Sequence, residues 1–115
     1  MKKIIKYALT FCFCAKIGLF TACQNQFNSP ISEQKLIDVL VDVHTAEALT
    51  ESEKQEVRDS MNRIYYDQIF EHHGIKKKDF DSTMSIYAHY PERFDTVYHR
   101  VERLVKRQRD TLTVK

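Results

Sequence analysis

Residues 33–49 read EQKLIDVLVDVHTAEAL, and their apolar positions recur with the period of an α-helix. At 100° per residue, the apolar side chains gather on one face and the opposite face is polar. Ser32 directly before this stretch is a favourable N-cap residue. The stretch therefore predicts a helix over residues 33–49. Its expected buried face holds Leu36, Ile37, Val39, Leu40, Val43 and Ala48.

A second helical segment follows after a short break. Ser52 and Gln55 have the spacing of a capping box, which predicts a helix from about residue 53 to 72. Gly74 comes just past this segment, where glycine is favoured because it adopts the left-handed conformation that ends helices. The stripe that we expect this helix to bury consists of Val57, Met61, Ile64, Tyr65 and Ile69.

Two more helices are predicted on either side of Tyr90-Pro91. A residue before proline is pushed out of the α region, whereas the proline itself suits the first turn of a helix. We expect a short helix over residues 77–88, a longer one over residues 91–109, and a frayed tail over residues 111–115. The fold class predicted for residues 32–110 is all-α, a small antiparallel bundle of three long helices plus one short helix.

The first 22 residues have the layout of a lipoprotein signal peptide. A lysine-rich start precedes an apolar run, and Phe20-Thr21-Ala22-Cys23 resembles a lipobox, the motif that is cut before a lipidated cysteine. Lys16 interrupts the apolar run, which leaves it short of the ~20 residues that span a bilayer. We predict a cleaved leader over residues 1–22, lipid on Cys23 and a tether over residues 23–31. Secretion without lipid and a retained anchor are the alternatives.

Removal of this leader changes the composition of the chain. All three cysteines (Cys12, Cys14 and Cys23) lie in the first 23 residues, so a mature, lipidated chain has no free thiol. This prediction excludes disulfides, thiolate zinc sites and cysteine nucleophiles. The leader also carries four lysines and no acidic residue, and the predicted mature chain therefore has a net charge of −2. Its composition gives no indication of nucleic-acid binding.

Charge is distributed unevenly over the remaining residues. Residues 33–71 carry 4 basic and 10 acidic side chains, whereas residues 76–115 carry 10 and 6. Two basic groups could contact anionic lipid headgroups, although such groups more often form a solvated face. These groups are Lys76, Lys77 and Lys78, and then Arg100, Arg103, Lys106, Arg107 and Arg109.

His44 and Glu47 are the candidate site residues of the first helix. Their i, i+3 spacing places them on one face, within the apolar stripe beside Leu40. An imidazole and a carboxylate must be paired if they are buried there. One hypothesis is a small-ligand or metal carrier that uses this pair, with His72 or a tyrosine as a further ligand. The alternative is a structural hydrogen-bond network to Tyr65, Tyr87 or Tyr98.

Catalysis is not indicated. The serines have no glycine-rich elbow, and the sequence has neither a phosphate-binding loop nor a paired metal motif. Two candidate ligands on one helix are weak spacing for a metal site. The adjacent histidines His72 and His73 precede a helix end, where an imidazolium favours the negative pole of the helix dipole. We therefore predict no catalytic residues, no resident metal and no cofactor.

Several motifs resemble one family. They are the stretch from Val39 to Ala48 (VLVDVHTAEA), His73-Gly74-Ile75, Phe80-Asp81-Ser82, and the junction from Tyr87 to Pro91-Glu92. Over residues 30–105 they are similar to the small lipoproteins of Bacteroidota grouped as domain of unknown function 4296. This resemblance implies a lipid anchor and a helical fold, and it implies no activity.

Together these observations predict a membrane-anchored lipoprotein of the cell envelope. The expected function is a non-catalytic interaction module, or adaptor, that binds another envelope protein; the alternative is the carrier hypothesis for His44 and Glu47. Because no acidic residue directly follows Cys23, we expect retention on the outer membrane, facing the periplasm. The expected partners are the membrane, through the lipid, and a second protein, with no nucleic acid.

Overall fold

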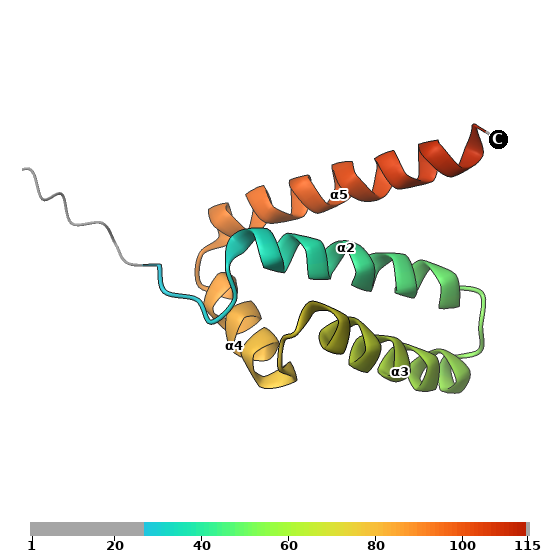
Figure 1. Ribbon diagram of the computed structural model, residues 1–115, viewed down its shortest axis with the longest axis horizontal. Helices are drawn as coiled ribbons and strands as arrows, with labels where there is room; N and C mark the ends of the chain where they lie inside the picture. The colour runs from blue at the N-terminus through green and yellow to red at the C-terminus, as the bar shows by residue number, and fades with distance from the viewer. Residues whose placement is uncertain (1–26, 115) are drawn as a thin grey trace, which may run out of the picture.

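The computed structural model describes residues 27–114, which form four α-helices (Figure 1). No strand occurs among these residues, so the predicted all-α class is confirmed. The predicted leader and Cys23 lie outside the described residues. The helices are α2 (Glu33–Thr50), α3 (Gln55–His73), α4 (Lys77–Ala88) and α5 (Pro91–Thr113).

The start of α2 and the end of α3 are set by the capping residues Ser32 and Gly74. Ser32 caps α2, because its hydroxyl oxygen accepts a hydrogen bond of 3.3 Å from the backbone N–H of Lys35. Gly74 ends α3 in the left-handed conformation, at φ 65°. The N–H groups of Gly74 and Ile75 donate to the carbonyls of Glu71 and Phe70, the hydrogen-bond pattern of a Schellman motif. Both caps were predicted from the sequence.

Two predicted boundaries are wrong. The capping box at Ser52 does not form, since α3 begins at Gln55 behind Lys54, which has no side-chain cap bond. Instead, the guanidinium of Arg58 holds the α2–α3 turn by donating to the carbonyls of Glu51 (3.0 Å) and Glu53 (3.1 Å). The second error concerns α5, which continues through the predicted tail to Thr113. No glycine or proline interrupts the helix there.

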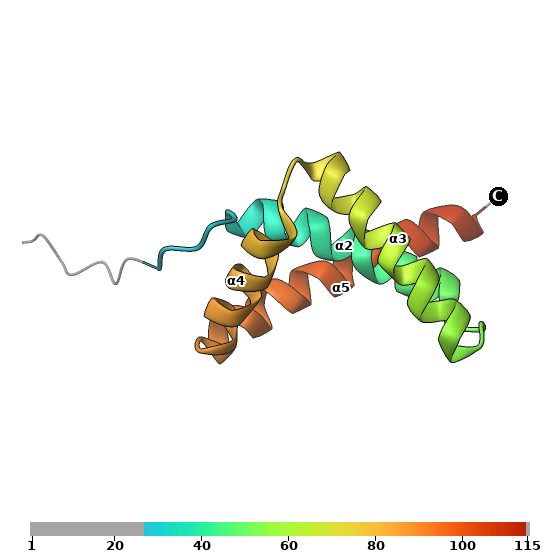
Figure 2. The same ribbon diagram turned by 90° about the horizontal axis from the view of Figure 1, so that it is seen from below.

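α2 is the central helix of the domain. It packs against both α3 and α5, whereas α3 and α5 make little or no contact with each other. α3 runs antiparallel to α2, and α5 runs in the same direction as α2 (Figures 1 and 2). The short α4 carries the chain across one end of this layer and packs against α5. The antiparallel arrangement expected for the bundle therefore holds for the α2–α3 pair.

The core lies on two sides of α2. On the α5 side, buried residues of α2 meet α4 and α5; on the α3 side, they meet Phe70. Ala48 was predicted to be buried but is exposed. Ala46 is the buried alanine of α2, because its side chain faces α3. The first cluster comprises Ile31, Leu36, Ile37, Leu40, Val41, Tyr87, Val97 and Val101, and the second comprises Val39, Val43 and Phe70.

None of the residues in the stripe predicted to be the buried face of α3 is fully buried: Val57 and Ile64 are exposed, and Met61, Tyr65 and Ile69 are partly buried. Val57 is 44% exposed and Ile64 is 55% exposed, while the one fully buried residue of α3 is Phe70. Tyr66 and Ile69 pack beside Phe70 against α2. α3 is apolar on two faces, and helical periodicity alone does not tell which face meets the rest of the domain. The sequence-based prediction therefore placed mostly residues of the outer face of α3 in the core.

The segment predicted as the end of a tether is part of the fold. Ile31 is 4% exposed, and its N–H donates to the hydroxyl of the buried Thr83 in α4 at 3.3 Å. The ring of Phe27 packs edge-on against Tyr87, with 4.7 Å between the ring centroids. Among the tether residues predicted at 23–31, those from Phe27 onward are therefore docked on α4.

Candidate functional site

His44 and Glu47 lie on α2 where it is flanked by α3 and α5. His44 Nδ1 is 3.4 Å from a carboxylate oxygen of Glu47, and the other oxygen accepts a hydrogen bond from the hydroxyl of Tyr66 in α3. On the α5 side, the His44 ring packs edge-on against Tyr98, with centroids 5.7 Å apart. The structure thus brings the two predicted residues together and ties them to both neighbouring helices.

The predicted burial of this pair is wrong. The side chains of His44 and Glu47 are 36% and 41% exposed. They remain accessible because α3 and α5 do not close over this side of α2. An open hollow of about 450 Å³ adjoins them, lined by His44, Glu47, Ala48, Glu51, Arg58 and Asn62.

Tyr66 is the partner that sequence reasoning missed. Burial, the hydrogen bond to Glu47 and the negative charge of Glu47 together raise the pKa of Tyr66 to about 12. Tyr66 is therefore protonated at neutral pH and donates its hydrogen to Glu47. The available signal was its i, i+4 spacing from Phe70, which places both side chains on the inner face of α3.

A second polar contact joins α2 to α3 near the Glu47–Tyr66 hydrogen bond. Thr50 is fully buried, and its hydroxyl donates to the side-chain oxygen of Asn62 at 2.8 Å. Buried hydroxyls need such partners, because an unmade hydrogen bond costs ~1–3 kcal/mol. The Glu47–Tyr66 and Thr50–Asn62 contacts thus each pair a donor with an acceptor across α2 and α3, whereas the nearby Nε of Arg58 is buried without a partner among the described residues.

His73 has a different role from the predicted helix cap. Its Nε2 lies 2.6 Å from a carboxylate oxygen of Asp42, and its side chain is only 11% exposed. This contact links the C-terminal end of α3 to the outer side of α2. The sequence carried no signal for it, because it depends on how the two helices are aligned.

A metal centre finds no support in the described part of the chain. Residues 27–114 contain no group of three or more histidine, cysteine, aspartate or glutamate side chains placed to hold a metal ion. The sequence predicted Tyr65, Tyr87 or Tyr98 as the hydrogen-bond partner of the His44–Glu47 pair. Of these, Tyr98 contacts His44 through ring packing alone, and Tyr87 is buried elsewhere in the core with no hydrogen-bond partner for its hydroxyl.

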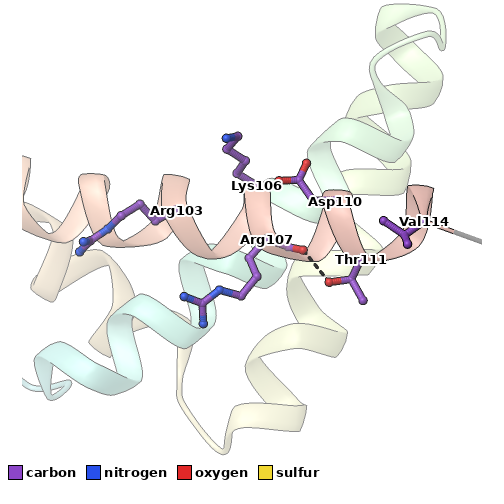
Figure 3. Close-up of a pocket in the computed structure, with 6 residues that line it drawn as sticks. All are labelled: Arg103, Lys106, Arg107, Asp110, Thr111 and Val114. Carbon is purple, nitrogen blue, oxygen red and sulfur yellow. Dashed lines mark hydrogen bonds between the residues drawn. The ribbon is translucent and has the colours of Figure 1, made fainter.

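Another hollow, of about 700 Å³, lies along the C-terminal part of α5 (Figure 3). Five of the six residues that line it belong to α5, and the sixth, Val114, is the C-cap of that helix. The side chains of Lys106 and Arg107 point away from each other. The dashed bond in the figure joins the Thr111 hydroxyl to the carbonyl of Arg107 within the same helix. A single helix supplies no opposing wall, so this is an exposed basic helix surface rather than an enclosing site.

Within the part of the chain that the structure describes, no helix combines the length and the hydropathy needed to cross a membrane. The described residues therefore form a small helical domain in which a His–Glu–Tyr contact and a His–Asp contact join α2 to its neighbours. Its class is that of a small helical module.

The chain belongs to the family described as a domain of unknown function (DUF4296), whose model matches residues 28–111. The match covers all four described helices, apart from the last residues of α5. No curated protein and no solved structure matches the chain.

Proposed function

We propose that this chain is a membrane-anchored lipoprotein of the cell envelope that acts as a non-catalytic protein-interaction module. Its anchor is lipid on Cys23, and its partner docks on the outer α3 face, which we define as Val57, Met61, Ile64 and Tyr65. The observation that carries the proposal is an apolar stripe at helical spacing that the domain itself leaves uncovered.

The exposure of this stripe is large for so small a domain. Ile64 and Val57 are 55% and 44% exposed, and neighbouring Leu49 on α2 is 67% exposed. Leu49 and Tyr65 line the same shallow hollow of about 420 Å³ between α2 and α3. Covering one aliphatic side chain of this size contributes up to ~1.5–3 kcal/mol. Val57 and Ile64 are about half exposed, so each contributes less than this upper value, and a partner must cover several such side chains to offset the cost of association.

Acidic residues next to the outer α3 face indicate the chemistry of the partner. Glu56, Asp67 and Glu71 are all exposed on one flank of the stripe. A matching surface presents aliphatic side chains with basic residues alongside, and an amphipathic helix supplies both in one element. Complementary charge of this kind speeds association and selects among partners.

The anchor rests on the sequence before the domain. Phe20-Thr21-Ala22-Cys23 supplies a lipobox-like site, and the preceding lysines and apolar run supply the export signal. A diacylated cysteine gives durable attachment, because two chains bind membranes far more stably than one. Mass spectrometry of the protein from its native cells tests this directly. We expect a chain that begins with lipidated Cys23, and an N-terminus at Met1 or an unmodified Cys23 contradicts it.

Site-specific photo-crosslinking in living cells tests the partner surface. A photoreactive residue in place of Ile64 is expected to give a discrete crosslinked product, and one in place of Val57 should give the same product. The matched control is Thr96, an exposed residue on α5 away from the stripe. Crosslinking that is equal at Thr96, or absent at both α3 positions, contradicts a partner on the outer α3 face.

A further inference from the structure

We infer that the corner formed by Phe27, Tyr90 and Arg93 rests on the membrane surface and that the α2–α3 turn lies at the opposite end of the domain, away from the membrane. We call these three residues the anchor corner. This inference rests on the proposed lipid on Cys23. It goes further because it assigns an orientation and a lipid-contacting surface to the domain.

The segment before α2 is held against the junction between α4 and α5. The Phe27 ring packs edge-on against Tyr87 and Tyr90, with centroid distances of 4.7 Å and 5.2 Å. The guanidinium of Arg93 lies 4.5 Å from the centre of the same ring, within the range of a cation–π contact. Phe27 is thus held on three sides by the junction between α4 and α5.

Hydrogen bonds fasten the residues that follow Phe27. The Ser29 hydroxyl donates to the carbonyl of Ile31 at 2.8 Å and lies 3.2 Å from the hydroxyl oxygen of Thr83. Thr83 also accepts from the N–H of Ile31. Because Thr83 is itself fully buried in α4, the entire stretch from Phe27 to Ile31 is fixed to this end of the domain.

Only a short distance remains between Phe27 and the lipid. Cys23 precedes Phe27 by four residues, and four residues of fully extended chain reach at most ~14 Å. A diacylated Cys23 sits at the membrane surface. The anchor corner must then lie within that reach of the headgroups, whatever path the intervening residues take.

The side chains of the anchor corner suit such a place. Tyr90 is 47% exposed, and although it occupies the N-cap position of α5, its side chain makes no capping hydrogen bond. A tyrosine ring with one apolar and one polar end is favoured at membrane–water interfaces. Arg93 is exposed beside it, and its long stem can rest on apolar groups while its charge meets a phosphate.

The opposite end of the domain combines an acidic α2–α3 turn with the basic C-terminal half of α5, where Lys106, Arg107 and Arg109 are exposed. The α2–α3 turn lies at the far end of α2 from the anchor corner (Figure 1), which is ~27 Å for 18 residues of helix. Exposed Glu51, Glu53 and Glu56 surround this turn. Anionic headgroups repel these carboxylates, which favours an orientation with the turn away from the membrane.

Depth-dependent fluorescence quenching tests the orientation on the full lipidated protein in vesicles of phosphatidylcholine and phosphatidylglycerol. Since the described residues contain no cysteine, single substitutions place one fluorophore at a time: Ala88→Cys beside the anchor corner and Ser52→Cys in the α2–α3 turn. A headgroup-attached quencher is expected to quench the first roughly tenfold more than the second, given ~27 Å of helix between them.

Three results overturn the inference. One is equal quenching at the two positions, and another is stronger quenching at Ser52→Cys. The third is strong quenching at Gln108→Cys as well, which means that the domain lies flat along α5. Failure of the proposed anchor is a separate observation, because a protein without lipid does not float with the vesicles at all.

Phe27→Ala tests whether the contacts of the Phe27 ring hold the anchor corner at the membrane. It removes the ring from the corner and leaves lipidation at Cys23 in place, so quenching at Ala88→Cys should fall while flotation and helical circular dichroism persist. The milder Arg93→Ala removes only the cation–π contact and the charge, and we expect a smaller fall. Quenching that neither variant changes contradicts the anchor corner.

Discussion

α2 and α3 are helices of nearly equal length with opposite relations to the core. α2 spans 18 residues and buries eight of them, whereas α3 spans 19 residues and buries one. α2 is flanked by α3 on one side and α5 on the other, and α3 meets the domain through one face only. Yet α3 carries apolar side chains on two faces.

This difference teaches that apolar content and burial are separate properties of a helix. The inner face of α3, through Tyr66, Ile69 and Phe70, contributes to the fold. The outer α3 face contributes little to the fold, and its exposed apolar side chains are the surface that the proposed partner would cover. Perturbing the two helices in matched ways should therefore separate effects on stability from effects on binding.

The largest effect is expected in the first turn of α2. Leu36 is fully buried, and Leu36→Ala should lower the free energy of unfolding by about 3 kcal/mol, because it leaves a cavity as well as losing apolar burial. Urea unfolding of the protein without residues 1–22, followed by circular dichroism, measures the change. A loss below about 1 kcal/mol, within the range of many surface substitutions, would show that α2 is not the centre of the core.

A medium effect is expected where α3 ends. Gly74 has φ 65° and nothing within 4 Å of the position that a Cβ would occupy, so Gly74→Ala introduces backbone strain without a clash. The strain costs ~1–2 kcal/mol for an L-residue in this conformation. Gly74→Asn should cost less, since asparagine tolerates the left-handed region better. Equal stability of the alanine variant and the parent in urea would contradict the Schellman cap.

A smaller effect concerns the contact between the two helices at Glu47 and Tyr66. The Tyr66 pKa of about 12 lies above its usual value of 10.0, so the protonated form is favoured in the folded state. Its contribution to stability is fully present below pH 10 and is lost as the pH rises toward 12.

Glu47→Gln tests this assignment. It should lower the Tyr66 pKa, although not fully to the usual value, because burial is the largest cause of the shift. NMR titration of isotope-labelled tyrosine follows the group directly, and Tyr90, which is exposed, serves as the internal control. A Tyr66 pKa that is the same in the variant and the parent would show that the hydrogen bond to Glu47 does not form in solution.

The smallest effect on stability is expected on the outer α3 face. Val57→Ala and Ile64→Ala together should change the free energy of unfolding by no more than about 0.5 kcal/mol, since both sites are exposed and alanine is the better helix former. The same double variant should lose the crosslinked partner in cells. If it unfolds at clearly lower urea than the parent, the outer face belongs to the core and not to an interface.

Much of this architecture was accessible from local sequence signals. The four helices, the Ser32 cap and the Gly74 cap depend on neighbouring residues, and all were predicted. The face of α3 was not accessible, because Val57–Ile64 and Tyr66–Phe70 both have helical spacing and only the three-dimensional arrangement chooses between them. Asp42 and His73 are 31 residues apart in the chain, so their contact was equally hidden.

The candidate site shows the same division. The i, i+3 spacing of His44 and Glu47 correctly predicted their contact. Their exposure follows from the gap between α3 and α5, which is a property of the whole domain. Choosing Tyr66 over Tyr65 as the partner required knowledge of which α3 face is inside.

The most direct test of the central claim compares the accessibility of the outer α3 face in cells and in isolation. Single substitutions Ile64→Cys and Val57→Cys should react rapidly with a membrane-impermeant thiol reagent in the purified protein and slowly in permeabilised native cells. Thr96→Cys on α5 should react equally fast in both. Rapid reaction of Ile64→Cys in the cells, at the rate of the purified protein, would contradict a partner on this face.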